Sequence, residues 1–217
     1  MEKPTLIIGN KNYSSWSLRP WILMCQNEID FNEKRVALFV DSMETELKEY
    51  DSDTKVPILK HGNLIVWDTL SIMEYASEQF LDSKGWPADI SARAVARSIS
   101  AEMHSSFSSV RNELPMNCRK KFNNIKLSTA AKKEVERITS LWRKCRKQYG
   151  AEGEWLFGKY SIADAMFAPI ALRFDGYNIA LEGIEKEYVQ SVLNQPCIID
   201  WIAAGKLEKE IIEADEI

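Results

Sequence analysis

The first eighty residues alternate between short apolar runs and longer segments in which apolar residues recur at helical spacing. Short runs are typical of β-strands, and the periodic segments are typical of helices that bury one face. Two of the runs flank the turn-prone sequence His61-Gly62-Asn63, which predicts a β-hairpin. The expected strands cover residues 5–8, 32–37, 57–60 and 64–66, and the expected helices cover residues 16–27 and 69–80.

The order of these elements, strand-helix-strand followed by strand-strand-helix, is that of a small thioredoxin-like α/β domain. We therefore expect residues 1–82 to form such a domain. Beyond the turn-prone stretch at 82–87, the strand signals stop and the second domain, residues 88–217, is expected to be all α. Its acidic end, residues 208–217, is expected to fray. The helical spacing covers roughly residues 88–117, 128–149, 162–174 and 186–203.

The composition is that of a globular protein with a small-molecule partner. The chain has 217 residues, 45% hydrophobic and 28% charged, which is enough for one large domain or two small ones. Its net charge is −4 and its basic residues are scattered, so we expect neither a nucleic-acid nor a membrane partner. The N-terminal apolar run is too short for a signal peptide, and no stretch approaches the roughly 18 apolar residues of a membrane span. We expect a cytoplasmic protein.

The four cysteines predict neither a metal site nor a disulfide framework. They lie far apart in the sequence, none forms a CxxC pair, and only His61 and His104 are available as imidazole ligands. We therefore expect no bound metal. The cysteines are Cys25, Cys118, Cys145 and Cys197.

Three serines and an arginine follow the first strand, in the sequence Ser14-Ser15-Trp16-Ser17-Leu18-Arg19. Free N–H groups and hydroxyls at a helix N-terminus stabilise anions, including thiolates. Serine is also among the commonest N-cap residues, so the turn has a structural interpretation as well as a functional one. Arg19, one turn into the helix, is interpreted as a structural ion-pair partner.

Two further motifs carry candidate chemistry, each with a structural alternative. Pro57 opens a short strand and cannot donate a ladder hydrogen bond, which indicates an edge or a bend. If the Val56–Pro57 bond is cis, the Val56 backbone can pair with an extended peptide, although most X-Pro bonds are trans. Asp68 and Thr69 begin a helix, where an N-cap explains both. In the functional alternative, Thr69 binds a carboxylate and Asp68 faces an ammonium group.

These motifs, in this order and ahead of an all-α segment, resemble those of the glutathione transferase family over essentially the whole chain. The serine turn is most similar to the SSxSxR turn of the zeta class and its bacterial relatives. The resemblance implies a thioredoxin-like domain that binds glutathione, followed by an all-helical glutathione transferase domain. It also implies a two-fold homodimer, and an attack by the glutathione thiolate on a small electrophile.

The resemblance implies that Ser14 faces the glutathione sulfur. A serine hydroxyl cannot take the thiol proton, so its role would be to donate a hydrogen bond to the sulfur anion. Such a bond is worth roughly 1.5 to 3 kcal/mol, or about one to two pKa units. Ser15 and Ser17 are further donors. Tyr13 is the alternative to Ser14; because neighbours in an extended segment point to opposite faces, one should dominate, and we favour Ser14.

The same resemblance assigns the other motifs to the rest of glutathione. The Val56 backbone would pair with the cysteinyl unit, and Pro57 would be the family's cis-proline. Asp68 and Thr69 would hold the γ-glutamyl end. Lys55 stands where zeta enzymes usually carry glutamine; it would reach the glycyl carboxylate, or it is an exposed lysine with no role.

The electrophile pocket is expected between the two domains. Trp16 stands where zeta isomerases usually have cysteine, and so large a ring would reshape the thiol end of the pocket, which puts maleylacetoacetate isomerisation in doubt. Arg111 and Arg173 are both candidates for holding an acidic co-substrate. Met103 and Phe107, four residues apart, also fit an ordinary core. From the long helix we expect the pocket residues Met103, His104, Phe107 and Arg111.

Ser161 and Asp164 predict a capping box at the start of the helix at 162–174. The family starts the central helix of its α domain with the same element, so we assign it a structural role.

Two other classes of function stay open for the chain. The fold also serves as a non-catalytic binding or regulatory module, and a ligandin-like carrier would bind apolar compounds with little turnover. The ligand-facing motifs favour a transferase.

Overall fold

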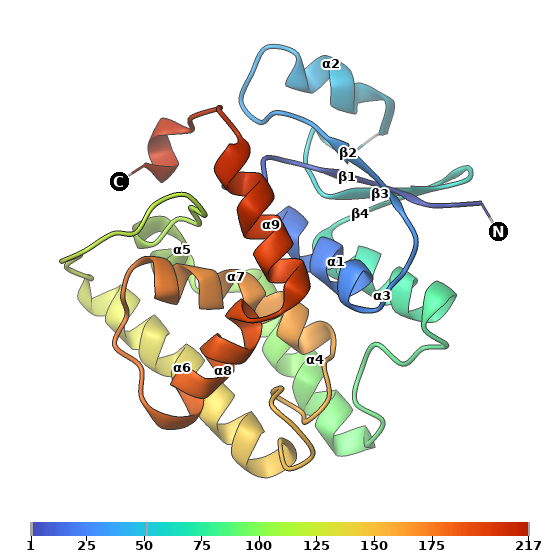
Figure 1. The fold of residues 1–217 in the computed structure, drawn as a ribbon. Helices are drawn as coiled ribbons and strands as arrows, with labels where there is room; N and C mark the ends of the chain where they lie inside the picture. Colours follow the sequence, from blue (N-terminus) through green and yellow to red (C-terminus); the bar gives the residue numbers. More distant parts are fainter. Residues whose placement is uncertain (1, 51, 217) are drawn as a thin grey trace.

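The computed structural model describes residues 2–50 and 52–216, and its N-terminal part contains a four-stranded sheet (Figure 1). The strands are β1 (Thr5–Ile8), β2 (Asn32–Arg35), β3 (Ile58–His61) and β4 (Leu64–Trp67). Their order in the sheet is β2-β1-β3-β4, in which β1 runs parallel to β2 and antiparallel to β3, and β3 forms a hairpin with β4. The four predicted strands are confirmed, with small shifts of their ends.

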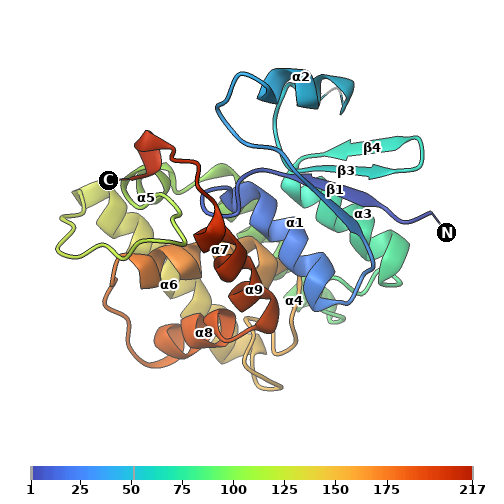
Figure 2. The ribbon, with the colours of Figure 1, turned by 45° about the horizontal axis from the view of Figure 1, so that its top comes forward.

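The helices of this part are α1 (Ser15–Gln26), α2 (Met43–Leu47) and α3 (Thr69–Phe80). Helices α1 and α3 lie on one face of the sheet and α2 lies on the other (Figure 2). Successive residues of β1 therefore point into different layers. Leu6 and Ile8 pack in the large core that includes α1 and α3, whereas Ile7 packs in a smaller core with Leu47 and Tyr50.

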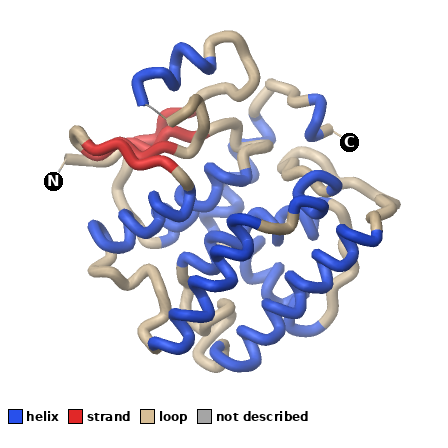
Figure 3. Tube along the Cα trace, turned by 180° about the vertical axis from the view of Figure 1, so that it is seen from behind, coloured by secondary structure: helices blue, strands red, loops and turns tan. Residues whose placement is uncertain are grey.

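The rest of the described chain is helical, as predicted, and it packs beneath α1 and α3 (Figure 3). Helix α7 lies at the centre of this part and packs against α1, α4, and α8. No helix among the described residues is long and apolar enough to cross a membrane. The helices are α4 (Ile90–Ser105), α5 (Ser108–Glu113), α6 (Thr129–Tyr149), α7 (Ile162–Gly176), α8 (Gly183–Leu193) and α9 (Pro196–Leu207).

Two of the long predicted helices are each divided in the structure. The segment predicted at 88–117 becomes α4 and α5, because Phe107 between them adopts a left-handed backbone conformation with φ 63°. The segment predicted at 186–203 becomes α8 and α9. Pro196 is the first residue of α9, and a proline in that position lacks the N–H that a continuous helix needs.

The sequence predicted no disulfide framework, but the structure contains one disulfide. Cys25 of α1 and Cys197 of α9 are bonded across a sequence separation of 172 residues. Spacing along the sequence gave no sign of this pair, because only the packing of α9 against α1 brings the two residues together. Cys118 and Cys145 are free, and burial raises the pKa of their thiols to about 12 and about 11.

The acidic C-terminal segment is held against the rest of the chain, so the prediction that it frays is wrong for residues 208–216. The Glu208 carboxylate accepts hydrogen bonds from the backbone N–H groups of Lys11 (2.8 Å) and Asn12 (3.0 Å). Arg35 forms an ion pair with Glu210 at 2.7 Å. Basic side chains and free backbone N–H groups therefore face Glu208 and Glu210.

The predicted capping box of α7 is present, and it is buried. The Asp164 carboxylate accepts hydrogen bonds from the Ser161 N–H at 2.9 Å and from the Ser161 hydroxyl at 3.0 Å. Its other oxygen accepts the Leu156 N–H at 3.0 Å. Asp164 therefore satisfies three buried donors in addition to starting the helix.

We expect Asp164→Ala to lower the free energy of unfolding by about 3 kcal/mol, because it removes the cap and leaves buried N–H groups without acceptors. Urea denaturation followed by circular dichroism measures this change. Asp200→Ala, on the exposed part of α9, is the matched control and should change stability by less than about 0.5 kcal/mol. Equal effects of the two substitutions would contradict the assignment.

Asp164 also predicts a pH dependence. Burial raises the pKa of its carboxyl from 3.8 to about 6, so between these values the folded protein holds a proton that the unfolded chain releases. The stability that Asp164 contributes therefore falls as pH rises from about 4 to 6. Relative to Asp164→Asn, which does not titrate, wild type should lose up to about 3 kcal/mol over this range in urea denaturation. A difference that stays constant or grows would count against this coupling.

Candidate functional site

A cavity of about 670 Å³ opens where the first residues of α1 and α3 meet the start of β3 and the end of α4. It brings together seven of the residues singled out from the sequence, although they come from four separate segments. Ser52, Asp53 and Trp67 also line it and were not predicted. The seven are Trp16, Lys55, Val56, Pro57, Asp68, Thr69 and His104.

Ser14 is the N-cap of α1 and is nearly buried, with 7% of its surface exposed. Its hydroxyl donates to the Ser17 hydroxyl at 2.8 Å and accepts the Ser17 N–H at 3.4 Å. The Ser17 oxygen also accepts the Gly9 N–H, at 3.0 Å. The structural interpretation of the serine turn is therefore confirmed, and the predicted contact of Ser14 with a sulfur remains a prediction.

Tyr13 points away from the cavity, into the C-terminal segment. Its hydroxyl donates to Glu216 at 2.5 Å and accepts a hydrogen bond from Arg119. Burial, together with the hydrogen bond to Glu216, raises the pKa of Tyr13. Because its proton is already donated to a carboxylate, this hydroxyl has none to offer a ligand, and Ser14 is the better candidate of the two.

The loop before β3 forms one side of the cavity. The Val56–Pro57 peptide bond is cis, as the resemblance implied. The Ser52 hydroxyl donates to the Lys55 carbonyl at 3.0 Å. The Lys55 side chain is exposed and forms an ion pair with Asp53 at 2.6 Å, so its ammonium group lies at the rim of the cavity.

Asp68 caps α3, as the structural alternative predicted. One carboxylate oxygen accepts the backbone N–H groups of Leu70 (2.9 Å) and Ser71 (3.2 Å). The neighbouring Thr69 hydroxyl donates to the Trp16 carbonyl at 2.8 Å, which ties the start of α3 to the start of α1. The carboxylate-binding role that was predicted for Thr69 is thus left to its backbone N–H, in the first turn of α3.

The other Asp68 oxygen lies 2.5 Å from Nε2 of His104, on α4. The sequence analysis placed His104 in the electrophile pocket and missed this partner. No local motif could have found it, because 36 residues separate the two side chains and only the packing of α4 brings them together. The His104 ring also lies edge-on to Trp16, with 5.2 Å between the ring centroids.

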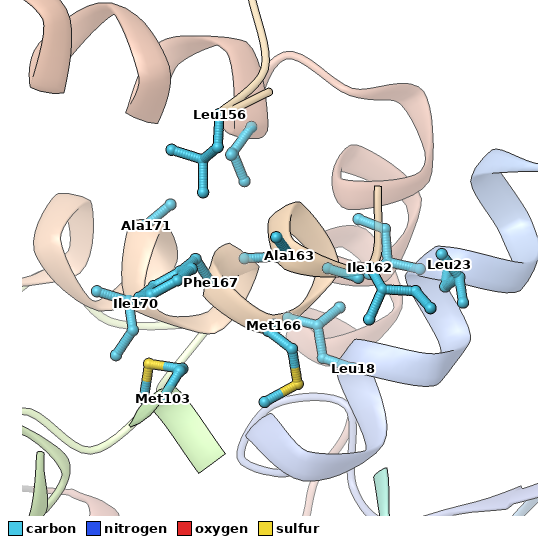
Figure 4. Packing of buried hydrophobic residues seen from close by; sticks show 14 of the residues in the cluster. Leu18, Leu23, Met103, Leu156, Ile162, Ala163, Met166, Phe167, Ile170 and Ala171 are labelled. Atoms are coloured by element: carbon cyan, nitrogen blue, oxygen red, sulfur yellow. The ribbon is translucent and has the colours of Figure 1, made fainter. Parts of the chain in front are cut away.

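Met103 and Phe107 do not line the cavity, so their predicted place in a substrate pocket is not supported by the structure. Both are buried in the main core. Figure 4 shows Met103 beside Ile170 and Met166 of α7. Met103 lies on the buried face of α4 that packs against α7. Phe107 lies beyond the end of α4, at the left-handed residue before α5, so the two residues do not share the helix face that their spacing predicted.

Arg111 also lies outside the cavity lining, and it contacts the site through Trp16. Its guanidinium donates to the Met103 and His104 carbonyls at the end of α4. It lies 4.7 Å from the centre of the Trp16 ring, and the Arg19 guanidinium lies 4.4 Å from the same ring. The indole is thus held by two cations.

Arg19 has no carboxylate partner among the described residues, so the predicted ion pair is wrong. It is buried and donates to the carbonyls of Met166 (3.0 Å) and Ser15 (3.4 Å). Arg173 donates to the Ser15 hydroxyl at 3.2 Å. Burial and the charges of Arg111 and Arg173 lower the pKa of Arg19, and burial lowers the pKa of Arg173 to about 10. Three cations therefore lie around the start of α1, a setting that favours an anion there.

Comparisons with known proteins agree with this architecture. Residues 13–79 match the family described as "Glutathione S-transferase, N-terminal domain". A "Probable maleylacetoacetate isomerase" from Caenorhabditis elegans is 28% identical over 182 residues, 83% of each chain. "Glutathione S-transferase 1" from Dianthus caryophyllus is 26% identical over 159 residues, 72% of this chain and 71% of its own.

Solved glutathione transferases share the fold. A homologue from Burkholderia, crystallised with bound glutathione, has a TM-score of 0.70 and 21% identity, and the match covers 94% of this chain and 98% of that one. A tau-class enzyme from mango has a TM-score of 0.69 and 18% identity, with 99% and 96% covered. The predicted fold class, a thioredoxin-like domain followed by a helical region, is confirmed. The predicted division at residues 82 and 88 remains a prediction.

The contacts of Tyr13 give a prediction for the C-terminal segment. Tyr13→Phe removes the hydroxyl between Glu216 and Arg119, so we expect a loss of about 1 kcal/mol in unfolding free energy. Amide hydrogen exchange over residues 208–216 should accelerate. The control is Tyr149→Phe, because the Tyr149 hydroxyl has no hydrogen-bond partner within the described chain. Unchanged exchange in Tyr13→Phe would show that the segment is held without this hydroxyl.

Proposed function

This chain is a member of the glutathione S-transferase family, and we propose that it binds glutathione in the 670 Å³ cavity and activates its thiol for attack on a small electrophile. The observation that carries the proposal is the meeting of two helix N-termini, α1 and α3, at one cavity that also contains a cis-proline. Two helix starts offer free N–H groups for a carboxylate and for a thiolate.

The lining residues suggest how the tripeptide lies. The γ-glutamyl end has an ammonium and a carboxylate, which suit the Asp68 carboxylate and the Thr69 N–H. The backbone of Val56 would pair with the cysteinyl unit, as a neighbouring strand would. Lys55 lies at the rim. Its ammonium group, now paired with Asp53, would pair with the glycyl carboxylate instead. This orientation directs the sulfur toward the start of α1.

The sulfur would be stabilised as a thiolate by the groups at the start of α1. The Ser14 hydroxyl can turn from Ser17 to the sulfur, because the Ser17 oxygen keeps its hydrogen bond from the Gly9 N–H. The helix N-terminus, the buried Arg19 and Arg173 and the partly buried Arg111 add positive potential. The thiol proton leaves to solvent, and the sulfur lone pair then forms the bond to the electrophilic carbon. With an aryl halide, the carbon–halogen bond breaks and the halide ion leaves; with an unsaturated electrophile, the displaced π electron pair takes up a proton from solvent.

The identity of the electrophile depends on Trp16, which lines the cavity and is fixed between Arg19 and Arg111. A rigid aromatic wall suits a flat, unsaturated or aromatic electrophile. The nematode relative is named as an isomerase. We propose conjugation, because the position that is cysteine in zeta isomerases is occupied here by this large ring.

We also propose that the protein forms a two-fold homodimer, as the family resemblance implies. The edge strand β4 exposes two large apolar side chains, Leu64 and Trp67, with 45% and 55% of their surfaces accessible. Such side chains on an edge strand favour contact with a second chain. Because Trp67 also lines the cavity, a partner subunit seated there would border the glutathione site.

Replacement of Ser14 tests the function. Wild type should be retained on immobilised glutathione and should conjugate an aryl halide such as 1-chloro-2,4-dinitrobenzene. Ser14→Gly removes the hydroxyl at little cost to the helix cap, so retention should persist while kcat/KM at pH 7 falls about 10- to 100-fold. A pH titration of the bound thiolate by ultraviolet absorbance should show a higher thiol pKa in Ser14→Gly.

Tyr13→Phe is the control for this experiment, and its kcat/KM should stay within about twofold of wild type. A larger loss in Tyr13→Phe than in Ser14→Gly would reverse the assignment of the thiolate partner. Retention without turnover in wild type would favour a carrier, and no retention at all would favour a non-catalytic binding module.

A further inference from the structure

His104 makes a contact that the proposed reaction does not use. Its Nε2 atom lies 2.5 Å from one Asp68 carboxylate oxygen, while the other oxygen caps α3. A carboxylate accepts hydrogen bonds and donates none, so the neutral imidazole must have its proton on Nε2. Each Asp68 oxygen thus has its own protein partner, and the carboxylate is fixed at both ends.

The His104 ring is itself held in place. It packs against the Trp16 ring in a T-shaped arrangement, and the Arg111 guanidinium donates to the His104 backbone carbonyl. His104 therefore links α4, from the helical part, to the N-cap of α3, from the sheet part. Asp68 has φ 72°, a left-handed conformation that is uncommon for a residue other than glycine. The Asp68 backbone is thus held in an uncommon conformation at the start of α3, and its side chain is oriented by His104.

The Asp68–His104 pair lies between a cavity and a neighbouring groove. Asp68 and His104 line the 670 Å³ cavity and also a neighbouring groove of about 650 Å³ between α3 and α4. The nearby charged groups are Glu74 and Glu78, which line the groove, and Arg19, whose charge attracts Asp68. Among the described residues, His104 is the hydrogen-bond partner of the Asp68 oxygen that does not cap α3.

We propose that His104 is a positioning residue, which orients the Asp68 carboxylate to receive the ammonium group of the γ-glutamyl end. The inference rests on the proposed function, since it assigns Asp68 to that ammonium. A carboxylate oxygen has two lone pairs; the imidazole N–H occupies one, and the other stays available to the ligand. His104 therefore determines the affinity for glutathione and takes no part in the chemistry at sulfur.

Two substitutions of similar size separate this role from packing. His104→Gln keeps an N–H donor, and His104→Met has none. We expect KM for glutathione to rise about tenfold in His104→Met and to stay within about threefold of wild type in His104→Gln. The kcat at saturating glutathione should stay within about twofold in both. His61→Gln, a substitution of the other histidine, which lies outside the cavity lining, is the matched control and should match wild type.

A glutathione analogue that lacks the amino group, glutaryl-cysteinylglycine, gives the decisive readout. It has no ammonium for Asp68, so its KM should be the same in wild type and in His104→Met. An equal rise in KM for both ligands, a fall in kcat, or an unchanged KM for glutathione in His104→Met would overturn the proposal. Failure of the proposed function looks different, because wild type itself would then show no turnover with either ligand.

Discussion

Helix α1 is packed between the sheet and the helical region, and the position of every group in the cavity depends on this placement. Two hydrogen bonds fix its first turn. The Gly9 N–H, on the sheet side, donates to the Ser17 hydroxyl, and the Thr69 hydroxyl of α3 donates to the Trp16 carbonyl. Its other face packs against α7 and α9. The disulfide of α1 with α9 joins the same two layers covalently. A helix confined in this way presents its N-terminus to the cavity in one orientation.

Burial of α1 explains the hydroxyls in its first turn. A buried helix start needs partners for its free N–H groups, and any polar side chain there must also be satisfied. Each serine meets a different requirement: Ser14 caps the helix, Ser17 accepts the N–H of Gly9 directly after β1, and Ser15 accepts from Arg173. The same density of donors makes the turn suitable for a thiolate. The structural and functional interpretations of the serine turn are therefore not alternatives, because satisfying a buried helix start also creates positive potential at it.

Much of the fold could be predicted because its signals are local. The cap residues Asp68 and Ser161 mark the starts of α3 and α7 in the sequence, and both starts lie where they were expected. The motifs in the sequence also predicted most of the residues that line the cavity. Periodicity could show that Met103 is on a buried face, but not which element covers that face. The Asp68–His104 contact and the disulfide depend on how distant helices pack, and no spacing in the sequence encodes that.

The C-terminal segment bears on the choice between a tyrosine and a serine hydroxyl at the start of α1. Tyr13 and Ser14 are neighbours, yet only the tyrosine reaches the segment, where Glu216 and Arg119 bind its hydroxyl. To serve a ligand, Tyr13 would have to give up its hydrogen bonds with both Glu216 and Arg119, whereas the Ser14 hydroxyl would give up only its contacts with Ser17. The Ser14 hydroxyl therefore loses fewer partners than the Tyr13 hydroxyl when it turns to bind an anion. The acidic residues of the C-terminal segment favour this outcome from more than 190 residues away in the sequence.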